Sequence, residues 1–351
     1  MLPRPTNVAM GREPKSKRGG ASRLTMQDIA RLANVSTPTV SRVLNGSPLV
    51  TEETRERVLE VARAHGYAVN RNAQKLRHAR TNTVAVVLDF GSHRHGAIGD
   101  PFIFELLAGV SEALSIRNQD LLLSPPGLDD ARAFRDFFQA RGADGFIVLG
   151  QGTRDAMLRS LARENLPLVV WGAVASDAGY CAVGSDNLAG GKLAAQHFLA
   201  QGRKRWLFLG DTRHEELRLR YEGLKLGAAG HSDVSIELLS IPSMAFTATG
   251  DAVTSYLAQG GGPDAVFAFS DTAAMAAIGS FRARGLTAPK DFSLVGYNNI
   301  PPTAHFSPAI TTIDQKTDVA GALLVEKLMQ RIDGGRPQSV TLPTRMVVRE
   351  T

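Results

Sequence analysis

The sequence predicts two folding units of different class: a small all-α head near the N-terminus and a large α/β region over the rest of the chain. Between residues 24 and 64 the apolar residues recur at helical spacing. From Thr81 onward, short apolar strands alternate strictly with amphipathic helices, which is typical of parallel sheets covered on both faces. The charge divides similarly, because residues 1–80 carry 15 Lys and Arg against 6 Asp and Glu, whereas the remainder is slightly acidic.

Length and composition narrow the class of protein. At 351 residues the chain exceeds one typical domain, so two or three folding units are expected. The apolar runs are only strand-sized, and no membrane span is predicted. The basic N-terminal segment has no apolar stretch behind it, which argues against a signal peptide and predicts a cytoplasmic, nucleoid-associated protein. A single cysteine, Cys181, excludes an internal disulfide framework.

The first helix of the head is predicted to begin after Thr25. Thr25 and Asp28 have the spacing of a capping box, and apolar residues follow at helical spacing. Asn34 can adopt the left-handed conformation that ends this helix, and Ser36 can cap a second one. Pro38 fits in the first turn, where an amide has no helical partner. Two short helices joined by so tight a turn form a helix-turn-helix, whose second helix can enter a DNA major groove.

The outward residues of that second helix suit phosphates and base edges. They are three hydroxyl side chains and a guanidinium: Thr37, Thr39, Ser41 and Arg42. An ordinary helical hairpin, with Val40, Val43 and Leu44 simply as core, is the alternative. A basic head on a slightly acidic body favours the DNA-binding interpretation.

The segments around this motif differ in character. Residues 1–23 are rich in Gly, Pro, Lys and Arg without periodicity, and we predict a disordered basic arm. Thr51 is predicted to cap a third helix with acidic residues in its first turn. Residues 70–77 form a second basic, helix-prone stretch, which is too short to be stable in isolation.

Ten strands and eight helices are predicted after Thr81, and that number of strands favours two doubly wound sheets over one. The strands lie near 83–89, 119–124, 144–149, 167–171, 181–184, 205–210, 236–240, 264–269, 292–296 and 310–313. The helices lie near 101–117, 129–141, 153–164, 187–201, 215–229, 246–259, 272–284 and 316–332.

The chain from Leu24 to Thr351 resembles the LacI/GalR family of bacterial transcription regulators. The motifs that carry the resemblance are TMQDIARLANVSTPTVSRVLNG, TRERV, HGY, NRNAQKL, DAVFAFSDTAAMAAI, APKDFSLVGYNNI and ITTIDQ. The resemblance implies a homodimeric, DNA-binding repressor that reads a pseudo-palindromic operator and responds to a small effector. No tetramerisation helix is expected beyond the last strand.

The resemblance also implies the domain organisation. The helix-turn-helix headpiece covers residues 24–69, and residues 70–80 form a hinge helix and linker. Residues 81–351 form an effector-binding and dimerisation domain, similar to a periplasmic binding protein, with two doubly wound parallel-sheet subdomains. The chain is expected to cross between these subdomains near residues 186, 314 and 342.

Further DNA contacts follow from the family. Its hinge helix folds in the minor groove, and the residue that matches Leu76 is wedged between the central base steps. Such a wedge costs a few kcal/mol, which phosphate contacts from basic neighbours offset. A helix residue docked on its own core is the alternative for Leu76. The implied DNA-binding residues are Thr37, Thr39, Ser41, Arg42, Asn45, Asn70, Arg71, Ala73 and Leu76.

The positions that match the family's effector contacts are Phe102, Arg220 and Asp271, and Trp171 and Asn298 are further candidates for the effector site. A guanidinium and a carboxylate such as Arg220 and Asp271 can together bind neighbouring hydroxyls. An aromatic side chain such as Phe102 offers an apolar face to a sugar ring. The alternatives are a surface position for Arg220, a helix N-cap for Asp271 and a core position for Trp171.

Two departures from the family bear on the effector. Asn298 and Asn299 stand where the family often has two aspartates, and His214 stands at a position that purine-binding members use. A mono- or disaccharide is therefore the preferred effector, and a nucleobase or phosphorylated sugar is the alternative.

The rival hypothesis is a sugar-metabolising enzyme with a basic N-terminal appendage. The chain has no Walker A loop, no H-E-x-x-H and no G-x-S-x-G, and the eight histidines are scattered. We therefore predict no catalytic residues, no metal site and no cofactor.

Overall fold

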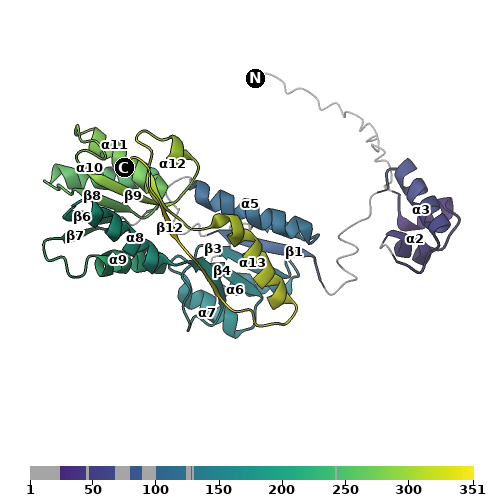
Figure 1. Ribbon diagram of the computed structural model, residues 1–351. Coiled ribbons are helices and arrows are strands. Elements are labelled where there is room, and N and C mark those ends of the chain that lie inside the picture. Colours follow the sequence, from purple (N-terminus) through teal and green to yellow (C-terminus); the bar gives the residue numbers. More distant parts are fainter. Residues whose placement is uncertain are drawn as a thin grey trace, which may run out of the picture. The chain divides into compact units, whose positions relative to one another are not determined.

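The computed structural model describes residues 24–44, 47–67, 80–88, 100–123, 128, 130–241 and 243–351. The chain divides into two compact units, Met1–Arg77 and His78–Thr351 (Figure 1). Five predicted DNA contacts lie outside the described residues, namely Asn45, Asn70, Arg71, Ala73 and Leu76.

The head consists of three helices: α1 (Met26–Leu32), α2 (Thr37–Leu44) and α3 (Glu52–Ala64). Thr51 holds the N-cap position of α3, but its hydroxyl donates to Oγ1 of Thr54 at 3.0 Å and accepts no backbone N–H. The predicted N-cap position and acidic first turn of this helix are confirmed. The core of the head is a single apolar cluster of Ile29, Ala30, Ala33, Val40, Val43 and Val58.

Local capping sets the geometry of the first two helices. Oγ1 of Thr25 accepts from the amide of Asp28 at 3.3 Å, and Oδ2 of Asp28 accepts from the amide of Thr25 at 2.9 Å. Asn34 has a φ of 52°, and Oγ of Ser36 accepts from the amide of Thr39 at 3.2 Å. The predicted capping box, left-handed turn and second cap are confirmed.

The first half of the larger unit is built on a six-stranded parallel sheet in the order β11-β5-β4-β3-β1-β2. Its strands are β1 (Thr83–Leu88), β2 (Asp120–Leu123), β3 (Gly145–Leu149), β4 (Leu168–Trp171), β5 (Cys181–Ser185) and β11 (Val340–Leu342). Alternate residues of the central strands pack on opposite faces. The helices are α5 (Pro101–Ile116) and α13 (Thr317–Ile332) on one face, with α6 (Ala131–Gln139) and α7 (Asp155–Arg163) on the other.

The second half repeats this arrangement with a six-stranded sheet in the order β12-β10-β9-β8-β6-β7. Its strands are β6 (Arg205–Leu209), β7 (Ser235–Leu239), β8 (Ala265–Ala268), β9 (Ser293–Asn298), β10 (Thr311–Asp314) and β12 (Arg345–Val347). Its helices are α8 (Asn187–Ala200), α9 (Glu215–Gly227), α10 (Phe246–Ala258), α11 (Asp271–Arg282) and α12 (Pro302–His305). Only β12, paired with β10, runs antiparallel to its neighbour among the described strands.

The predicted fold class is confirmed, and every strand and helix predicted after Thr81 is present to within two residues at its ends. The predicted basic arm, residues 1–23, and the predicted hinge helix, residues 70–77, lie outside the described residues. Three elements were not predicted: β11, β12 and the short helix α12. Each is three or four residues long, which is too short for a periodic pattern to be recognised in the sequence.

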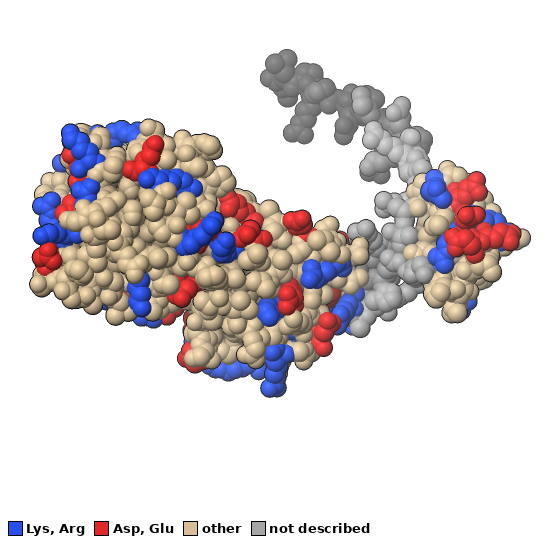
Figure 2. Space-filling view, in the orientation of Figure 1, with Lys and Arg blue, Asp and Glu red and all other residues tan. Residues whose placement is uncertain are grey.

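The two halves are connected three times. The chain leaves the first sheet after β5, returns to it after β10, and crosses again between β11 and β12. The surface of the larger unit carries interspersed charges of both signs, without one dominant field on the face seen in Figure 2. Among the described residues, no helix is both long and apolar enough to cross a membrane.

Candidate functional site

The second helix of the head presents the hydroxyl and guanidinium groups predicted from sequence. Arg42 is exposed in the last turn of α2, and Thr37, Thr39 and Ser41 are half-buried beside it. The hydroxyls of Ser36 and Thr39 are hydrogen-bonded to each other at 2.8 Å, so the first turn of α2 is fixed. The helix contains no acidic residue, whereas acidic side chains gather over α3 in Figure 2. DNA phosphates would therefore meet α2 with less repulsion than α3.

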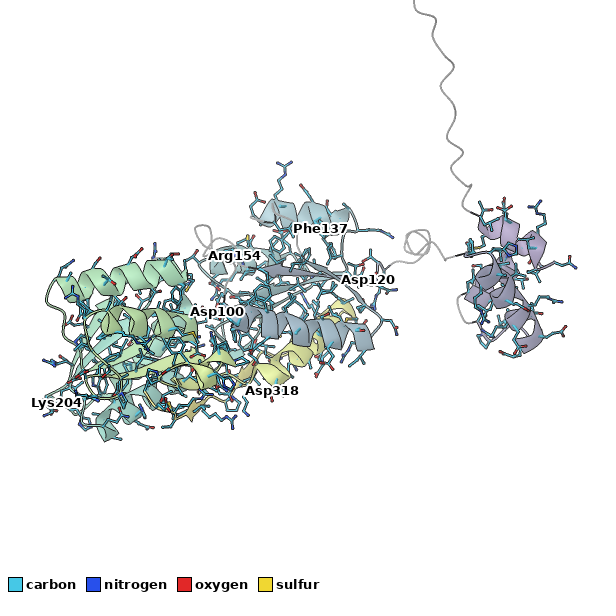
Figure 3. The ribbon with its side chains drawn as sticks, turned by 90° about the horizontal axis from the view of Figure 1, so that it is seen from above. Asp100, Asp120, Phe137, Arg154, Lys204 and Asp318 are labelled. Atoms are coloured by element: carbon cyan, nitrogen blue, oxygen red, sulfur yellow. The ribbon has the colours of Figure 1, made fainter. Side chains whose placement is uncertain are left out.

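A cavity of about 130 Å³ lies between the two halves of the larger unit. It is lined by residues at the carboxyl ends of strands from both sheets, where open α/β sheets bind ligands. Asp100 lies at this junction, directly before α5, as Figure 3 shows. The strand ends that line the cavity include Leu149, Trp171, Ser185, Phe269, Asn298 and Gln315.

Two aromatic rings form one wall of the cavity. The ring centroids of Phe102 and Trp171 are 5.9 Å apart, with an angle of 50° between the planes. Both side chains line the cavity, and both also belong to the core cluster beneath α5 and α13. Trp171 is thus a core residue that also shapes the cavity.

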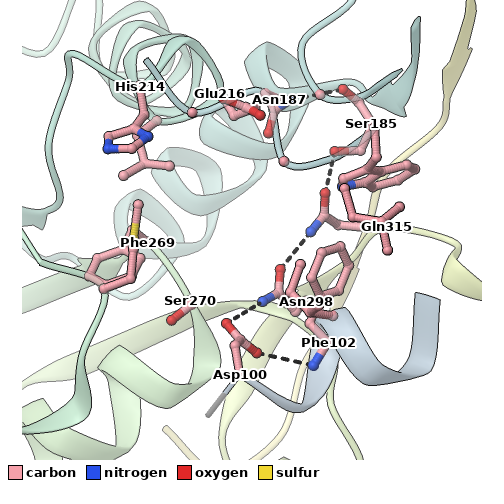
Figure 4. A pocket seen from close by; sticks show the side chains of 18 of the residues that line it. Asp100, Phe102, Ser185, Asn187, His214, Glu216, Phe269, Ser270, Asn298 and Gln315 are labelled. Atoms are coloured by element: carbon pink, nitrogen blue, oxygen red, sulfur yellow. Dashed lines mark hydrogen bonds between the residues drawn. The ribbon is translucent and has the colours of Figure 1, made fainter. Parts of the chain in front are cut away.

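A chain of hydrogen bonds lines the cavity, starting in the first half, passing through Asn298 of the second half and returning to the first (Figure 4). The hydroxyl of Ser185 donates to Oε1 of Gln315 at 2.6 Å, and Nε2 of Gln315 donates to Oδ1 of Asn298 at 2.5 Å. Nδ2 of Asn298 donates to Oδ2 of Asp100 at 3.4 Å, and the amide of Phe102 donates to Oδ1 of Asp100 at 3.1 Å. The two halves are therefore connected through polar groups that a ligand can also use.

Asp100 is half-buried at the edge of the cavity. Burial raises its pKa, while the hydrogen bond from Phe102 and the positive charge of Arg220 oppose that shift. Members of the family often have two aspartates at the positions that Asn298 and Asn299 occupy in this chain, so a carboxylate is missing there. Here a carboxyl group faces Asn298 from the opposite half instead.

Arg220 lies on α9 and is 6% exposed, which rules out a surface position. Nε donates to Oδ1 of Asn187 at 2.8 Å, and Nη1 donates to the carbonyl of Phe269 at 2.6 Å. The guanidinium carbon lies 3.6 Å from the centre of the Tyr297 ring. Because an arginine has five N–H donors, this arrangement fixes the side chain and leaves donors for a ligand.

Asp271 is not placed where the sequence predicted it. It is 0% exposed and does not line the cavity, and both its oxygens have partners inside the protein. The hydroxyl of Thr312 donates to Oδ1 at 2.5 Å, and the amide of Ile300 donates to Oδ2 at 2.9 Å. The alternative role as N-cap is also wrong, since Ser270 caps α11 one residue earlier. Asp271 instead holds the turn that follows Asn298.

Several cavity residues were missed as candidates by the sequence analysis. Asp100 was noted only as the neighbour of Phe102, and His214 only as a departure from purine-binding relatives. The remaining polar lining residues are Ser185, Asn187, Glu216, Ser270 and Gln315. All of these residues follow or end a strand or begin a helix, so strand-end position was the available signal.

Comparison with known proteins gives one consistent picture. Residues 25–70 match the model for bacterial regulatory proteins of the lacI family, and residues 195–351 match the model for a periplasmic binding protein-like domain. The ribose operon repressor of Haemophilus influenzae is 30% identical over 93% of this chain and 98% of its own length.

Two solved structures cover almost the whole chain. A complex of the transcriptional regulator CelR with cellobiose is 27% identical, with a TM-score of 0.66 over 93% of this chain and 99% of that one. The lac repressor dimer, bound to operator and the anti-inducer ONPF, is 23% identical. Its TM-score is 0.81 over 94% of this chain and 99% of that one.

Proposed function

The chain belongs to the lacI family of bacterial regulatory proteins, and from this premise we propose that it is a repressor whose operator affinity is changed by a small sugar. The observation that supports a sugar most directly is the cavity between the two halves. It combines an aromatic wall with a continuous row of hydrogen-bonding groups, the combination that recognises a ring bearing hydroxyls.

The proposed effector contacts are four of the five predicted from sequence, together with residues of the hydrogen-bonded chain. The four are Phe102, Trp171, Arg220 and Asn298. Asp100 and Gln315 are added because both are hydrogen-bonded to Asn298: Asp100 accepts from it and Gln315 donates to it. Carboxylate, amide and guanidinium groups together provide both donors and acceptors, as neighbouring hydroxyls require. Two similar proteins, a ribose operon repressor and the transcriptional regulator CelR in complex with cellobiose, support this class of ligand.

The proposed DNA interface places α2 in the major groove. Arg42 and the hydroxyls of Thr37, Thr39 and Ser41 would meet phosphates and base edges. The segment that contains Leu76 would fold in the minor groove as a marginal helix, so that its formation responds to the effector. A coupling of about 1–3 kcal/mol between the two sites changes operator affinity about 5- to 150-fold.

A homodimer is proposed because two copies are needed to read a pseudo-palindromic operator. The larger unit also carries exposed large apolar side chains on three elements of its second half, α9, β7 and α10. Leu226, Leu238 and Phe246 are each between 39% and 52% exposed. Burying such residues against a second copy would remove apolar surface from water.

The experiment that tests the proposed function is fluorescence anisotropy of a labelled upstream DNA fragment, titrated with the protein at fixed salt. A panel of mono- and disaccharides is then added at half-saturation. We expect one sugar to change the operator Kd about 5- to 150-fold. Tight binding that no sugar changes would contradict the effector class, and turnover of a sugar in the same sample would favour the rival enzyme.

Replacing Arg42 with alanine tests the assignment of the recognition helix. We expect operator binding to weaken by about 1–3 kcal/mol, with discrimination relaxed at one operator position, if Arg42 contacts a base. Arg31→Ala is the matched control, because Arg31 is also exposed but lies on α1. Uniform weakening on all DNA sequences would make Arg42 a phosphate contact, and no change would remove α2 from the interface.

A further inference from the structure

A second cavity, of about 540 Å³, lies in the first half of the larger unit. It is formed by the end of α7, the connection between β4 and β5, and the segment between α13 and β11. Leu168 and Cys181, which are the first residues of β4 and β5, line it. Trp171 and Ser185 line the sugar cavity at the other ends of the same strands. The two cavities are thus separate sites at opposite ends of one sheet.

The charged side chains that line the second cavity are all positive. Its lining contains two arginines, Arg331 and Arg336, and no aspartate or glutamate among the described residues. Such a cavity has a positive potential that favours anions. The sugar cavity differs, because its lining contains both carboxylates and a guanidinium.

The two arginines differ in the hydrogen bonds that they make within the protein. Arg331, in the last turn of α13, donates to Oδ1 of Asn165 at 3.2 Å and to the carbonyl of Gly335 at 3.4 Å. A cation in the last turn of a helix also interacts favourably with the helix dipole, so Arg331 by itself is weak evidence for an anion-binding site. Arg336 lies outside any helix, is exposed, and has no hydrogen bond or ion pair with another described residue. Its guanidinium is available to a bidentate oxyanion.

The rest of the lining is suited to the organic part of a ligand. The hydroxyl of Ser339 accepts from the amide of Ala182 at 3.0 Å and is also hydrogen-bonded to the Cys181 thiol, so we assign it no contact with the ligand. The hydroxyl of Tyr180 is hydrogen-bonded to Gln151 and Asp155, so only the ring of Tyr180 can contact a ligand in the cavity. The apolar lining residues are Ala162, Leu166, Leu168, Val174 and Ala175. A cavity of this volume has the size of a small-molecule site.

We propose that this cavity is a second binding site, which takes a small organic anion with a carboxylate or phosphate group on an apolar skeleton. The anionic group is bound by Arg336 and Arg331, and the skeleton packs against the apolar lining. The site borders the entry of the chain into the larger unit, because Arg80 donates to the carbonyl of Ile332 and to Oδ1 of Asp333 at 2.8 Å. The proposal does not depend on the sugar site, so either can fail without the other.

The test is isothermal titration of the full-length protein with phenyl phosphate, benzoate and the neutral control phenol. We expect saturable binding of at least one anion and none of phenol. Binding of phenyl phosphate alone identifies a phosphate ligand, and binding of benzoate alone identifies a carboxylate. The absence of saturable binding by both anions up to about 10 mM, which is weaker than small-molecule sites require, overturns the proposal.

Variants locate the bound anion. The double variant Arg331→Gln, Arg336→Gln should weaken binding at least about tenfold, and Arg336→Gln alone, at an exposed position, should weaken it measurably without a change in Tm. The matched control removes the same charge at two exposed positions outside both cavities, Arg132→Gln and Arg205→Gln. Ser176→Trp, which adds bulk at an exposed lining residue, should also weaken binding. Equal affinity in the double variant and its control overturns the site.

Discussion

Replacing Arg220 with methionine abolishes the response of operator binding to the sugar, while operator binding itself remains. The variant removes the guanidinium from a cavity that it lines and leaves Asn187 and the carbonyl of Phe269 without their donor. A hydrogen bond to a charged group contributes about 1.5–3 kcal/mol. If the remaining N–H groups of Arg220 donate two hydrogen bonds to the sugar, their loss weakens sugar binding at least about 100-fold. The measurement is the sugar titration of the protein–operator complex by fluorescence anisotropy.

Two companion variants separate the role of Arg220 from its effect on folding. Arg218→Met removes a cation two residues earlier on α9, where Arg218 pairs with Glu215 at 2.6 Å and does not line the cavity. We expect it to respond to sugar like the parent protein. Arg220→Lys keeps the charge but loses the two-pronged geometry, so an intermediate response is expected. An Arg220→Met protein with an unchanged sugar midpoint and an unchanged Tm would place the effector elsewhere.

Replacing Asp271 has a large effect on stability, and the effect depends on pH. Burial raises the pKa of Asp271 to about 8, against the hydrogen bonds from Thr312 and Ile300, which lower it. An unfolded aspartate has a pKa of about 3.9. Between these values the folded state holds a proton that the unfolded state has lost. The contribution of Asp271 to stability therefore falls as pH rises from about 4 to about 8, by up to about 5 kcal/mol.

Asp271→Asn removes this dependence. An amide can accept from Ile300 with its oxygen and donate with its nitrogen to the oxygen of Thr312, whose hydroxyl proton then turns away from residue 271. The expected result is that Asp271→Asn gains stability over the parent protein as pH rises from 5 to 8. Asp271→Ala, in contrast, leaves two buried partners unpaired and is destabilised by about 1–3 kcal/mol for each at low pH.

Urea unfolding followed by tryptophan fluorescence measures these differences. Both tryptophans of the chain, Trp171 and Trp206, lie in the larger unit, so tryptophan fluorescence reports the unfolding of that unit and not of the head. Asp251→Asn, at an exposed position on α10, is the control for removing one charge. A difference between the parent and Asp271→Asn that stays constant from pH 5 to 8 would contradict the assignment.

The head and the order of elements could be predicted from sequence because their determinants are local. A capping box needs two residues three apart, and Thr25 and Asp28 form it with no help from the rest of the chain. The strict alternation of strand and helix predicted two parallel sheets, since each buried strand forms a short apolar run. The strands β11 and β12 escaped prediction because they are held by pairing with β5 and β10, which are far away in sequence.

The candidate site was predictable only in part. Phe102 and Arg220 were singled out by matching the family, Trp171 as an aromatic wall and Asn298 as a departure from the family, and the structure places all four around one cavity. Asp271 was assigned to the ligand on the same grounds, but burial directs its carboxyl group to Thr312 and Ile300 instead.

The sequence by itself therefore determined the two folding units, the strand and helix order and the residue types available for binding. These follow from periodicity, capping and charge, which act over a few residues. The tertiary structure alone decided which polar groups meet. The hydrogen-bonded chain of Ser185, Gln315, Asn298 and Asp100 joins positions as much as 198 residues apart. No local rule encodes such a contact, because it exists only when the carboxyl ends of two separate sheets face one cavity.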